Sequence, residues 1–478
     1  MRELFAQSSP RKISLALAAA ALFVRLAVMP FLYRENLDPE RDHWMFGHEQ
    51  GRVARSIVLG QGFVNPLFGE TGATAYAAPV YPYFMAAVFR VFGIYSRSSA
   101  VVIVALNCLF SALVVVPLYF YGRRSFGERT AIVASCLWVI FPYSVYWTIV
   151  RIWDTWLTTL LISILFLLTL ELANTNAVPK WAGFGLLWGL TILLNPVALA
   201  ILPPLVLWMI YSLHRQGRRW LLPAAVCAVC VIAVMAPWIM RNYLAFHRFI
   251  PVRDSLGLEL YVGNDGNDTE LYDLKAGPWK NGAEWKRFLQ LGEIAYFDEK
   301  GLIAAEYIRS HPGYYVGKCI RRLVNIWTDF WSLSPAFRND DPYSPLVAVL
   351  CTLLSIFTLW GLWEAFRKDA FGAMPYSIVL FFYPLVYCFT HTADWYRRPI
   401  DPFFVVLAAY AVSTRWNDEK TPSPSSSAQV RSASNSLAAG GSWHVRLLHR
   451  LHAPVARANG THAKSHHTIF KRTEIPDS

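Results

Sequence analysis

The sequence has few charged residues for its length. Only 16% of its 478 residues are Asp, Glu, Lys or Arg, whereas a soluble chain usually carries about 25%. Hydrophobic residues make up 55% of the chain, and the mean hydropathy is +0.32. Apolar runs of about 20 residues recur along the sequence, as expected for helices that cross a membrane. The shortage of charge therefore excludes an ordinary soluble protein.

Cysteine is scarce in the segments that are predicted to lie outside the membrane, where disulfides would form. Of the seven cysteines, all but Cys319 lie in or at the edge of apolar runs, which excludes a disulfide-stapled outer domain. Cys227-x-x-Cys230 has the spacing of a metal or redox pair, but it lies within a run rich in Val and Ala. Small buried packing residues are the commoner use of such cysteines, and we favour that interpretation.

The net charge of +12 does not indicate a nucleic-acid partner. Lys and Arg fall mostly in short loops on alternate sides of the apolar runs, which is the positive-inside pattern of membrane proteins. The pattern predicts ten spans with both termini in the cytoplasm, and a first span that is retained rather than cleaved. The predicted spans are 13–33, 99–121, 130–141, 151–172, 181–194, 197–213, 220–240, 344–366, 375–390, and a tenth that ends near 414.

The fold class we expect is an all-α polytopic bundle of about ten transmembrane helices. Residues 1–240 would form the catalytic membrane module, with a first outer loop over 34–98 that carries interfacial helices, one of them over 78–93. Residues 241–343 would form a small outer domain of α/β-type or mixed structure, including an amphipathic helix over 300–327. Residues 344–416 would complete the bundle.

The last segment, 417–478, is predicted to be a disordered cytoplasmic tail. It is rich in Ser, Ala, His and Arg and holds six of the twelve histidines. Metal binding by the tail is one interpretation. We prefer a solvated basic tail that touches anionic membrane lipid, with a short interfacial helix over 443–451.

Several arginines lie on the outer side, where the charge rule predicts few. They are Arg52, Arg55, Arg151, Arg241, Arg253, Arg397 and Arg398. Snorkelling toward lipid headgroups would explain any one of them. Together they predict a basic pocket at the outer membrane surface, because a guanidinium group suits bidentate contact with phosphate oxygens.

Three carboxylates near the same surface are candidates for acid–base chemistry. Asp42 and Glu49 are seven residues apart, so a helix would place both on one face. Glu49 is also three residues from Arg52 and can simply pair with it. Asp154 begins an apolar span, where an ionisable residue is a functional candidate. The acids are also of a type that holds Mg²⁺ or Mn²⁺, although no ligand set is assigned.

Four stretches resemble bacterial C-type membrane glycosyltransferases, of the protein O-mannosyltransferase-like and lipid A aminoarabinose transferase-like families. The first two are 46–55 with 60–63 and 78–82, and Phe141-Pro142 with Trp153-Asp154-Thr155. The others are 236–243 with 250–253 and 263–264, and 391–402, which contains Tyr396-Arg397-Arg398-Pro399. The resemblance covers about residues 10–415.

The resemblance implies an inverting transfer of a sugar from a polyprenyl-phosphate-linked donor to a lipid, glycan or protein acceptor. The reaction would take place at the periplasmic face of the bacterial inner membrane. Relatives keep an acid in the first outer loop, often as an adjacent pair, whereas Asp42 and Glu49 stand apart here. Glu49 is favoured as the base because it lies next to Gly51-Arg52-Val53-Ala54, which matches the helix after the acid in relatives.

The remaining site residues follow from the same comparison. Asp154 would be a second acid that orients the acceptor or a metal. The donor phosphate would be bound by Arg397, Arg398, Arg241 and Arg151, with Tyr396 and His391 shaping the site.

Two other classes would use a basic outer pocket. One is a transporter or flippase of polyprenyl-linked lipid or oligosaccharide, which would bind without chemistry. Such proteins usually show internal repeats with matched broken helices, and the sequence shows no such repeat. The other is an O-antigen-type ligase or polymerase.

Overall fold

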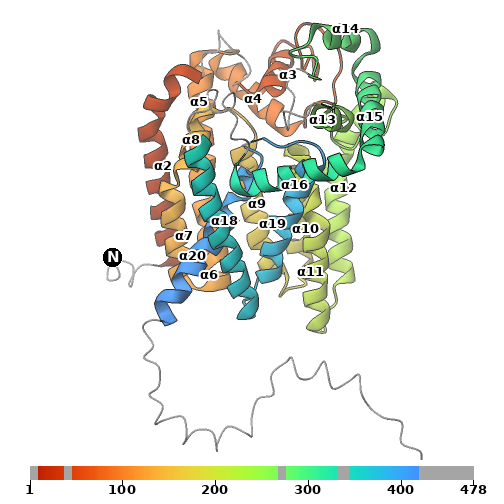
Figure 1. Ribbon diagram of the computed structural model, residues 1–478. Helices are drawn as coiled ribbons and strands as arrows, with labels where there is room; N and C mark the ends of the chain where they lie inside the picture. The colour runs from red at the N-terminus through yellow and green to blue at the C-terminus, as the bar shows by residue number, and fades with distance from the viewer. Residues whose placement is uncertain (1–8, 37–45, 267–275, 331–343, 394, 419–478) are drawn as a thin grey trace, which may run out of the picture. The chain divides into compact units, whose positions relative to one another are not determined.

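The computed structural model describes residues 9–36, 46–266, 276–330, 344–393 and 395–418, and every element named within them is a helix. The long apolar helices stand side by side in a bundle, and several short helices gather at one end of it (Figure 1). The bundle contains α2 (Pro10–Asn36), α5 (Arg97–Leu113), α6 (Val115–Phe126), α7 (Glu128–Ile140), α8 (Pro142–Val150), α9 (Thr155–Leu172), α10 (Val178–Leu194), η1 (Pro196–Ala200), α11 (Leu202–Arg215), α12 (Leu221–Phe246), α18 (Ser344–Arg367), α19 (Ala373–Phe389) and α20 (Asp401–Asp418).

The other helices belong to the two long outer segments. The first outer loop contributes α3 (His48–Val58) and α4 (Val80–Phe92), and the second segment contributes α13 (Leu256–Gly263), α14 (Gly282–Leu291), α15 (Glu293–Ser310) and α16 (Pro312–Thr328). A short helix, η3 (Arg398–Ile400), precedes α20.

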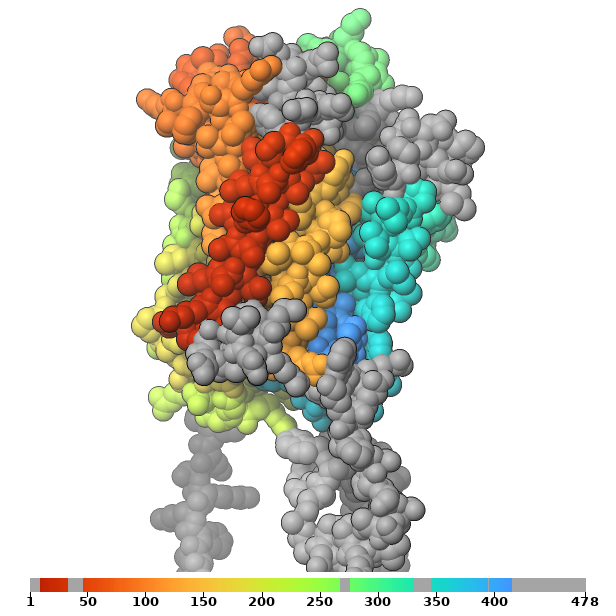
Figure 2. All heavy atoms as spheres, turned by 90° about the vertical axis from the view of Figure 1, so that its left-hand side faces the viewer, coloured from red at the N-terminus to blue at the C-terminus, as the bar shows by residue number. Residues whose placement is uncertain are grey.

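The predicted spans are all helical. Among the described residues, six helices are long and apolar enough to cross a membrane, and a seventh span results if α7 and α8, which meet at a bend of 44°, count as one. Two more predicted spans correspond to the shorter apolar helices α10 and α19, and the tenth corresponds to α20. The first span, α2, lies along the outside of the bundle (Figure 2). The structure thus confirms an all-α membrane bundle.

Two details of the outer segment were predicted wrongly. An α/β-type or mixed domain was expected over 241–343, but the described part of this range contains helices and no strand. The single amphipathic helix expected over 300–327 is two helices, because Pro312 lacks the amide needed to continue α15 and instead begins α16. The predicted tail helix over 443–451 lies outside the described residues.

The bend between α7 and α8 is held by an arginine. Pro142 has no amide to donate to the carbonyl of Trp138, four residues earlier. The guanidinium group of Arg25, which is fully buried, donates to that carbonyl at 3.3 Å, to Val139 O at 3.4 Å and to Ser144 Oγ at 3.0 Å. Arg25 therefore supplies the donor that the proline lacks. Its charge is tolerated inside the bundle because backbone carbonyls accept hydrogen bonds from it.

α16 exposes its apolar side and buries its polar side. Lys318, Arg322 and Asn325 are at most 2% exposed, whereas Val316 and Ile320 are 56% and 57% exposed. The helix lies across the bundle near the short outer helices (Figure 1). This is the arrangement of a helix at a membrane surface, with the apolar face toward lipid.

α10 and α12 approach closely through two glycines, Gly185 and Gly189, spaced four apart. A Cβ at Gly185 would collide with the carbonyl oxygen of Cys227, and one at Gly189 would lie 2.7 Å from Val234 Cβ. Small residues at this spacing let two membrane helices approach. Cys227 and Cys230 thus pack against the glycine face of α10, in agreement with their interpretation as packing residues.

We expect Gly185→Ala to destabilise the protein by about 1–3 kcal/mol, because the added methyl group forces two backbones apart. Gly183→Ala is the matched control: it lies on the same helix, and its Cβ would have nothing within 4 Å. Thermal unfolding of both variants in detergent measures the difference. Equal melting temperatures for the two variants would contradict this account of the α10–α12 contact.

Candidate functional site

A cavity of about 360 Å³ lies where α3, α13, η1 and the loop before η3 meet. Its polar lining consists of His48, Glu49, Gln50, Tyr76, Arg151, Asp154, Thr155, Asn195, Arg253, Ser255, Glu259, Tyr387, Thr390, His391 and Tyr396. Its apolar lining includes Ala77, Ala78, Trp153, Leu194, Val197, Leu199, Met235, Val252, Leu256, Trp279, Val386 and Trp395. The cavity therefore offers paired charges on one side and span residues on another, as a ligand with a polar head and an apolar chain would need.

Glu49 is brought to the cavity by a tight entry into α3. Phe46 forms a parallel β-bridge with Ile152, which places the first outer loop beside the segment that carries Arg151 and Asp154. Gly47 then takes a φ of 80°, a conformation that favours glycine. Gly51 is also required, because a Cβ there would lie 2.5 Å from the carbonyl oxygen of Phe46.

A short hydrogen-bonded chain fixes the Glu49 carboxylate. His48 Nδ1 lies 2.9 Å from Glu49 Oε2, and Arg52 lies 3.3 Å from His48 Nε2. Burial lowers the pKa of His48, so a neutral imidazole donates through Nδ1 and accepts from Arg52. Burial alone would raise the pKa of Glu49, but the hydrogen bond from His48 and the charge of Arg253 outweigh it and the pKa is lowered. Glu49 is therefore held ionised.

Asp154 faces the same cavity with the opposite shift. It is 5% exposed, precedes α9, and accepts a hydrogen bond of 3.2 Å from Asn195. Burial raises the pKa of Asp154 to about 7, assisted by the charge of Glu49 and opposed by Arg253 and Asn195. The pKa values of two carboxylates in one cavity are thus shifted in opposite directions, which is how environment assigns separate acid–base roles.

Two guanidinium groups line the cavity. Arg253 donates to Tyr76 O at 2.6 Å and to Glu259 Oε1 at 3.2 Å. Burial disfavours its charge, but Glu259 and Glu49 outweigh this effect and raise its pKa. Arg151 is 4% exposed, and its guanidinium carbon lies 3.4 Å from the ring centre of Trp395 and 4.6 Å from that of Trp153. Both cations therefore line the cavity and carry positive charge there.

His391 and Tyr396 form the opposite wall. His391 Nε2 lies 2.8 Å from the Tyr396 hydroxyl, and its Nδ1 lies 3.3 Å from the carbonyl oxygen of Glu259. Burial lowers the pKa of His391, so the neutral ring donates to Glu259 and accepts from Tyr396. Tyr396 also stacks on Tyr387, with ring centres 4.2 Å apart.

The cavity gathers five of the predicted site residues: Glu49, Asp154, Arg151, Tyr396 and His391. Asp42 lies outside the described residues. Arg241, Arg397 and Arg398 do not line the cavity. Each has protein partners instead.

Those three arginines hold the surrounding segments. Arg241 donates to Phe63 O at 2.7 Å and Thr74 O at 2.6 Å, which ties the first outer loop to α12. Arg397 and Arg398 pair with Asp401 at 2.7 and 3.0 Å. An outer arginine satisfied by a backbone carbonyl or an aspartate looks the same in a sequence as one that binds phosphate.

Three residues of the cavity were not predicted as site residues from the sequence: Arg253, Glu259 and Asn195. Signals were present: Arg253 was among the outer arginines and ends the 250–253 stretch, and Asn195-Pro196 breaks an apolar run. Glu259 offers no comparable signal, because it lies in an ordinary short helix.

The described part of the structure does not provide a set of ligands for a divalent metal ion. Within the described residues, no three His, Cys, Asp or Glu side chains are arranged to hold a metal ion. We therefore derive no step through a metal.

Comparisons with known proteins support the class of the chain over part of its length. Among solved structures, the archaeal oligosaccharyltransferase AglB from Archaeoglobus fulgidus, in complex with an inhibitory peptide and a dolichol-phosphate, is 15% identical with a TM-score of 0.49. That match covers 92% of this chain and 53% of AglB, so the chain spans about half the length of AglB. ArnT from Cupriavidus metallidurans, bound to undecaprenyl phosphate, is 13% identical with a TM-score of 0.35, over 82% of this chain and 77% of ArnT.

A further AglB structure, a complex with Zn and sulfate, is 14% identical with a TM-score of 0.45, over 84% of this chain and 49% of that one. Likenesses at these scores carry no argument about this chain. A search of curated protein sequences gives no match.

Residues 76–240 match the family model of dolichyl-phosphate-mannose-protein mannosyltransferases. Over those residues, which include Arg151, Asp154 and Asn195, the match confirms the resemblance to membrane glycosyltransferases that the sequence stretches indicated.

Proposed function

We propose that this protein is an integral-membrane glycosyltransferase that transfers a sugar, with inversion, from a polyprenyl-phosphate-linked donor to a hydroxyl-bearing lipid, glycan or protein acceptor. The observation that carries the proposal is the cavity in which Glu49 and Asp154 face Arg151 and Arg253. Proton acceptance and stabilisation of a leaving phosphate are the two functions that such a transfer requires. The family match over 76–240 supports the same class.

The chemistry assigns a role to each group. Glu49 accepts the proton of the acceptor hydroxyl as its oxygen attacks the anomeric carbon. The bond from that carbon to the phosphate oxygen breaks, and the phosphate leaves with the electron pair. Arg151 and Arg253 neutralise the charge that gathers on the phosphate. Asp154 accepts a hydrogen bond from the acceptor and orients it.

The apolar lining supports a lipid-linked donor. Leu194, Val197 and Leu199 follow the outer end of α10 and continue into η1, and Met235 lies on the neighbouring α12. The polyprenyl chain of a donor that leaves the cavity past these residues would run along the membrane-spanning helices. In the proposed orientation the cavity faces the periplasm and the spans cross the bacterial inner membrane, as the loop charges indicate.

A transporter or a ligase would use the same basic cavity differently. A transporter needs the cations but not an ionised base held beside them. The hydrogen bond from His48 to Glu49, which holds this carboxylate beside the cations, therefore favours chemistry over transport.

The experiment that tests the proposal is transfer of radiolabelled sugar from polyprenyl-phosphate donors by the purified protein. Glu49→Gln should lower turnover on the order of 10²-fold while donor binding is retained, because the amide cannot accept a proton. Asp42→Asn should have a smaller effect. The control is Glu364→Gln: Glu364 is also buried, but it pairs with Arg367 at 2.6 Å away from the cavity lining.

No transfer by the wild-type protein with any donor, together with donor binding, would favour the transporter. Normal turnover of Glu49→Gln beside an inactive Asp42→Asn would move the base to Asp42.

The pH dependence tests Asp154. Its pKa of about 7 means that the carboxyl is mostly protonated near pH 6 and mostly ionised near pH 8. Because the proposed role needs the anion, kcat/KM should rise with pH across this interval, while Glu49, with its lowered pKa, is already ionised. Asp154→Asn should give a lower and flat profile. A rise that persists unchanged in Asp154→Asn would assign the titration to another group.

Phosphate binding tests Arg253. Arg253→Lys keeps the charge but loses the fork that reaches Tyr76 and an anion together. Its affinity for undecaprenyl phosphate should fall about tenfold, which corresponds to roughly 1.4 kcal/mol. Arg248→Lys is the control, since Arg248 is paired with exposed Asp298 at 2.6 Å outside the cavity. Equal affinities in the two variants would exclude direct contact by Arg253.

A further inference from the structure

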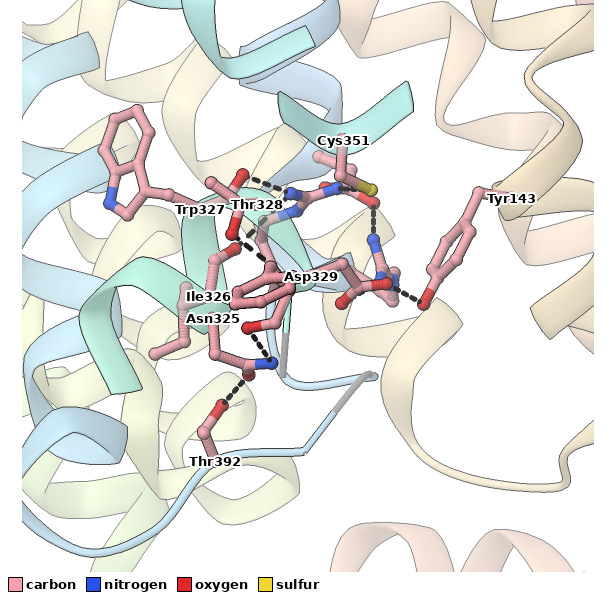
Figure 3. A network of polar contacts seen from close by, with 12 residues as sticks. Tyr143, Asn325, Ile326, Trp327, Thr328, Asp329, Cys351 and Thr392 are labelled. Atoms are coloured by element: carbon pink, nitrogen blue, oxygen red, sulfur yellow. Dashed lines mark hydrogen bonds and ion pairs between the residues drawn. The ribbon is translucent and has the colours of Figure 1, made fainter. Parts of the chain in front are cut away.

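Two arginines and two aspartates form a buried cluster next to the cavity. Arg397, Arg398, Asp329 and Asp401, which we call the Arg–Asp cluster, carry two positive and two negative charges. Arg398 and Asp401 are fully buried, and Arg397 is 2% exposed. Figure 3 shows Asp329 between Tyr143 on one side and the end of α16 on the other. Buried charges are stable only when they are paired and hydrogen-bonded. Loss of one member of the cluster therefore destabilises the other members.

Arg397 fastens η3 to the end of α16. Its guanidinium group donates to Trp327 O at 3.0 Å and Ile326 O at 3.3 Å, and to Asp401 at 2.7 Å. The last carbonyls of a helix have no partner within the helix and favour a positive charge. Arg397 thus acts as the cap of α16.

Asp329 joins three elements at that point. It follows α16 with a φ of 57°, an unusual conformation for a residue other than glycine. Both of its oxygens lie 3.2 Å from Arg398 Nη2, and Oδ2 accepts a hydrogen bond of 2.6 Å from Tyr143 on α8. The guanidinium carbon of Arg398 also lies 3.4 Å from the ring centre of Tyr143. One carboxylate therefore connects α16, α8 and η3.

The segment held by the cluster carries one wall of the cavity. His391, Trp395, Tyr396 and Pro399 all line the cavity, and Arg397 and Arg398 lie between the last two. The other end of the segment is also tied to α16, through a hydrogen bond of 3.1 Å from Thr392 to Asn325. α16 thus holds this wall at both ends.

We propose that Asp329 is a positioning residue for the cavity: by pairing with Arg398 it sets where Trp395 and Tyr396 lie, and through Trp395 the position of Arg151. The role assigned to Arg151 rests on the proposed function; the fastening of the wall does not. Without the Asp329 charge, Arg398 keeps only Asp401, which it shares with Arg397, and the buried cluster gains a net positive charge. The wall then loses its fixed position.

The test measures the affinity of the full-length protein in detergent for undecaprenyl phosphate, together with the mobility of a nitroxide at Ala393→Cys. The labelled protein carries Ser in place of the partly exposed Cys136, Cys230 and Cys319. Asp329→Asn should weaken binding about tenfold, because a shifted wall moves Arg151 away from the phosphate, and should sharpen the nitroxide spectrum. Asp329→Glu, which restores the charge, should recover most of the affinity and the broad spectrum.

Two further variants complete the test. Asp298→Asn breaks an exposed Arg–Asp pair of the same type and should change neither readout. Tyr143→Phe removes one hydrogen bond to Asp329 but keeps the ring beside Arg398, so it should give a smaller loss of the same kind even if Asp329→Asn does not fold. Wild-type affinity and an unchanged spectrum in Asp329→Asn, or in Tyr143→Phe where only that variant folds, would overturn the proposal. Failure of the wild type to bind undecaprenyl phosphate would instead overturn the proposed function.

Discussion

The cost of burying a guanidinium group organises this structure. A buried arginine needs hydrogen-bond acceptors for its donors. In this structure the acceptors are repeatedly backbone carbonyls that have no donor within the secondary structure. Arg25 donates to the carbonyl that loses its donor at Pro142. Arg397 donates to a carbonyl at the end of α16, and Arg241 donates to two carbonyls of the irregular first outer loop. Arg322 in the same way donates to Gly263 O and to Cys388 O at the end of α19. Irregular backbone at membrane depth is tolerated only where protein groups satisfy it, and arginines supply those groups here.

This use of arginine explains how far the sequence could predict the molecule. Apolar runs and loop charges were sufficient for the helices, because length and hydropathy act locally. They were insufficient for the outer arginines. Arg151 and Arg253 line the cavity, whereas Arg241 and Arg397 bind backbone. Every residue has a carbonyl, so a sequence does not mark which carbonyl an arginine will find.

The site shows the same division between local and long-range information. Glu49 and Asp154 were predicted separately, each from its place near a membrane boundary. Their shared cavity depends on the bridge between Phe46 and Ile152, which joins residues more than a hundred positions apart. Burial raises and Arg253 lowers both pKa values, and the hydrogen bond from His48 brings the pKa of Glu49 below its ordinary value. Nothing in the sequence around Arg253 indicates that this residue faces either acid. The break at Pro312, by contrast, was a local signal that amphipathic periodicity concealed.

The two kinds of arginine also determine how the cavity can respond to a ligand. Arg397 is paired with Asp401 and donates to two carbonyls, and Arg398 is paired with Asp401 and Asp329, so an arriving phosphate would have to displace partners that are already buried. Arg151 packs against the indole rings of Trp153 and Trp395, whose faces favour a cation. The side chain of Arg253 is 27% exposed, although it also donates to Tyr76 O and Glu259. A phosphate in the cavity would therefore contact Arg151 and Arg253, which line it, while Arg397 and Arg398 hold the wall formed by Trp395 and Tyr396. The two arginines that line the cavity come from segments far apart in the chain, and the two that hold the wall come from a third segment.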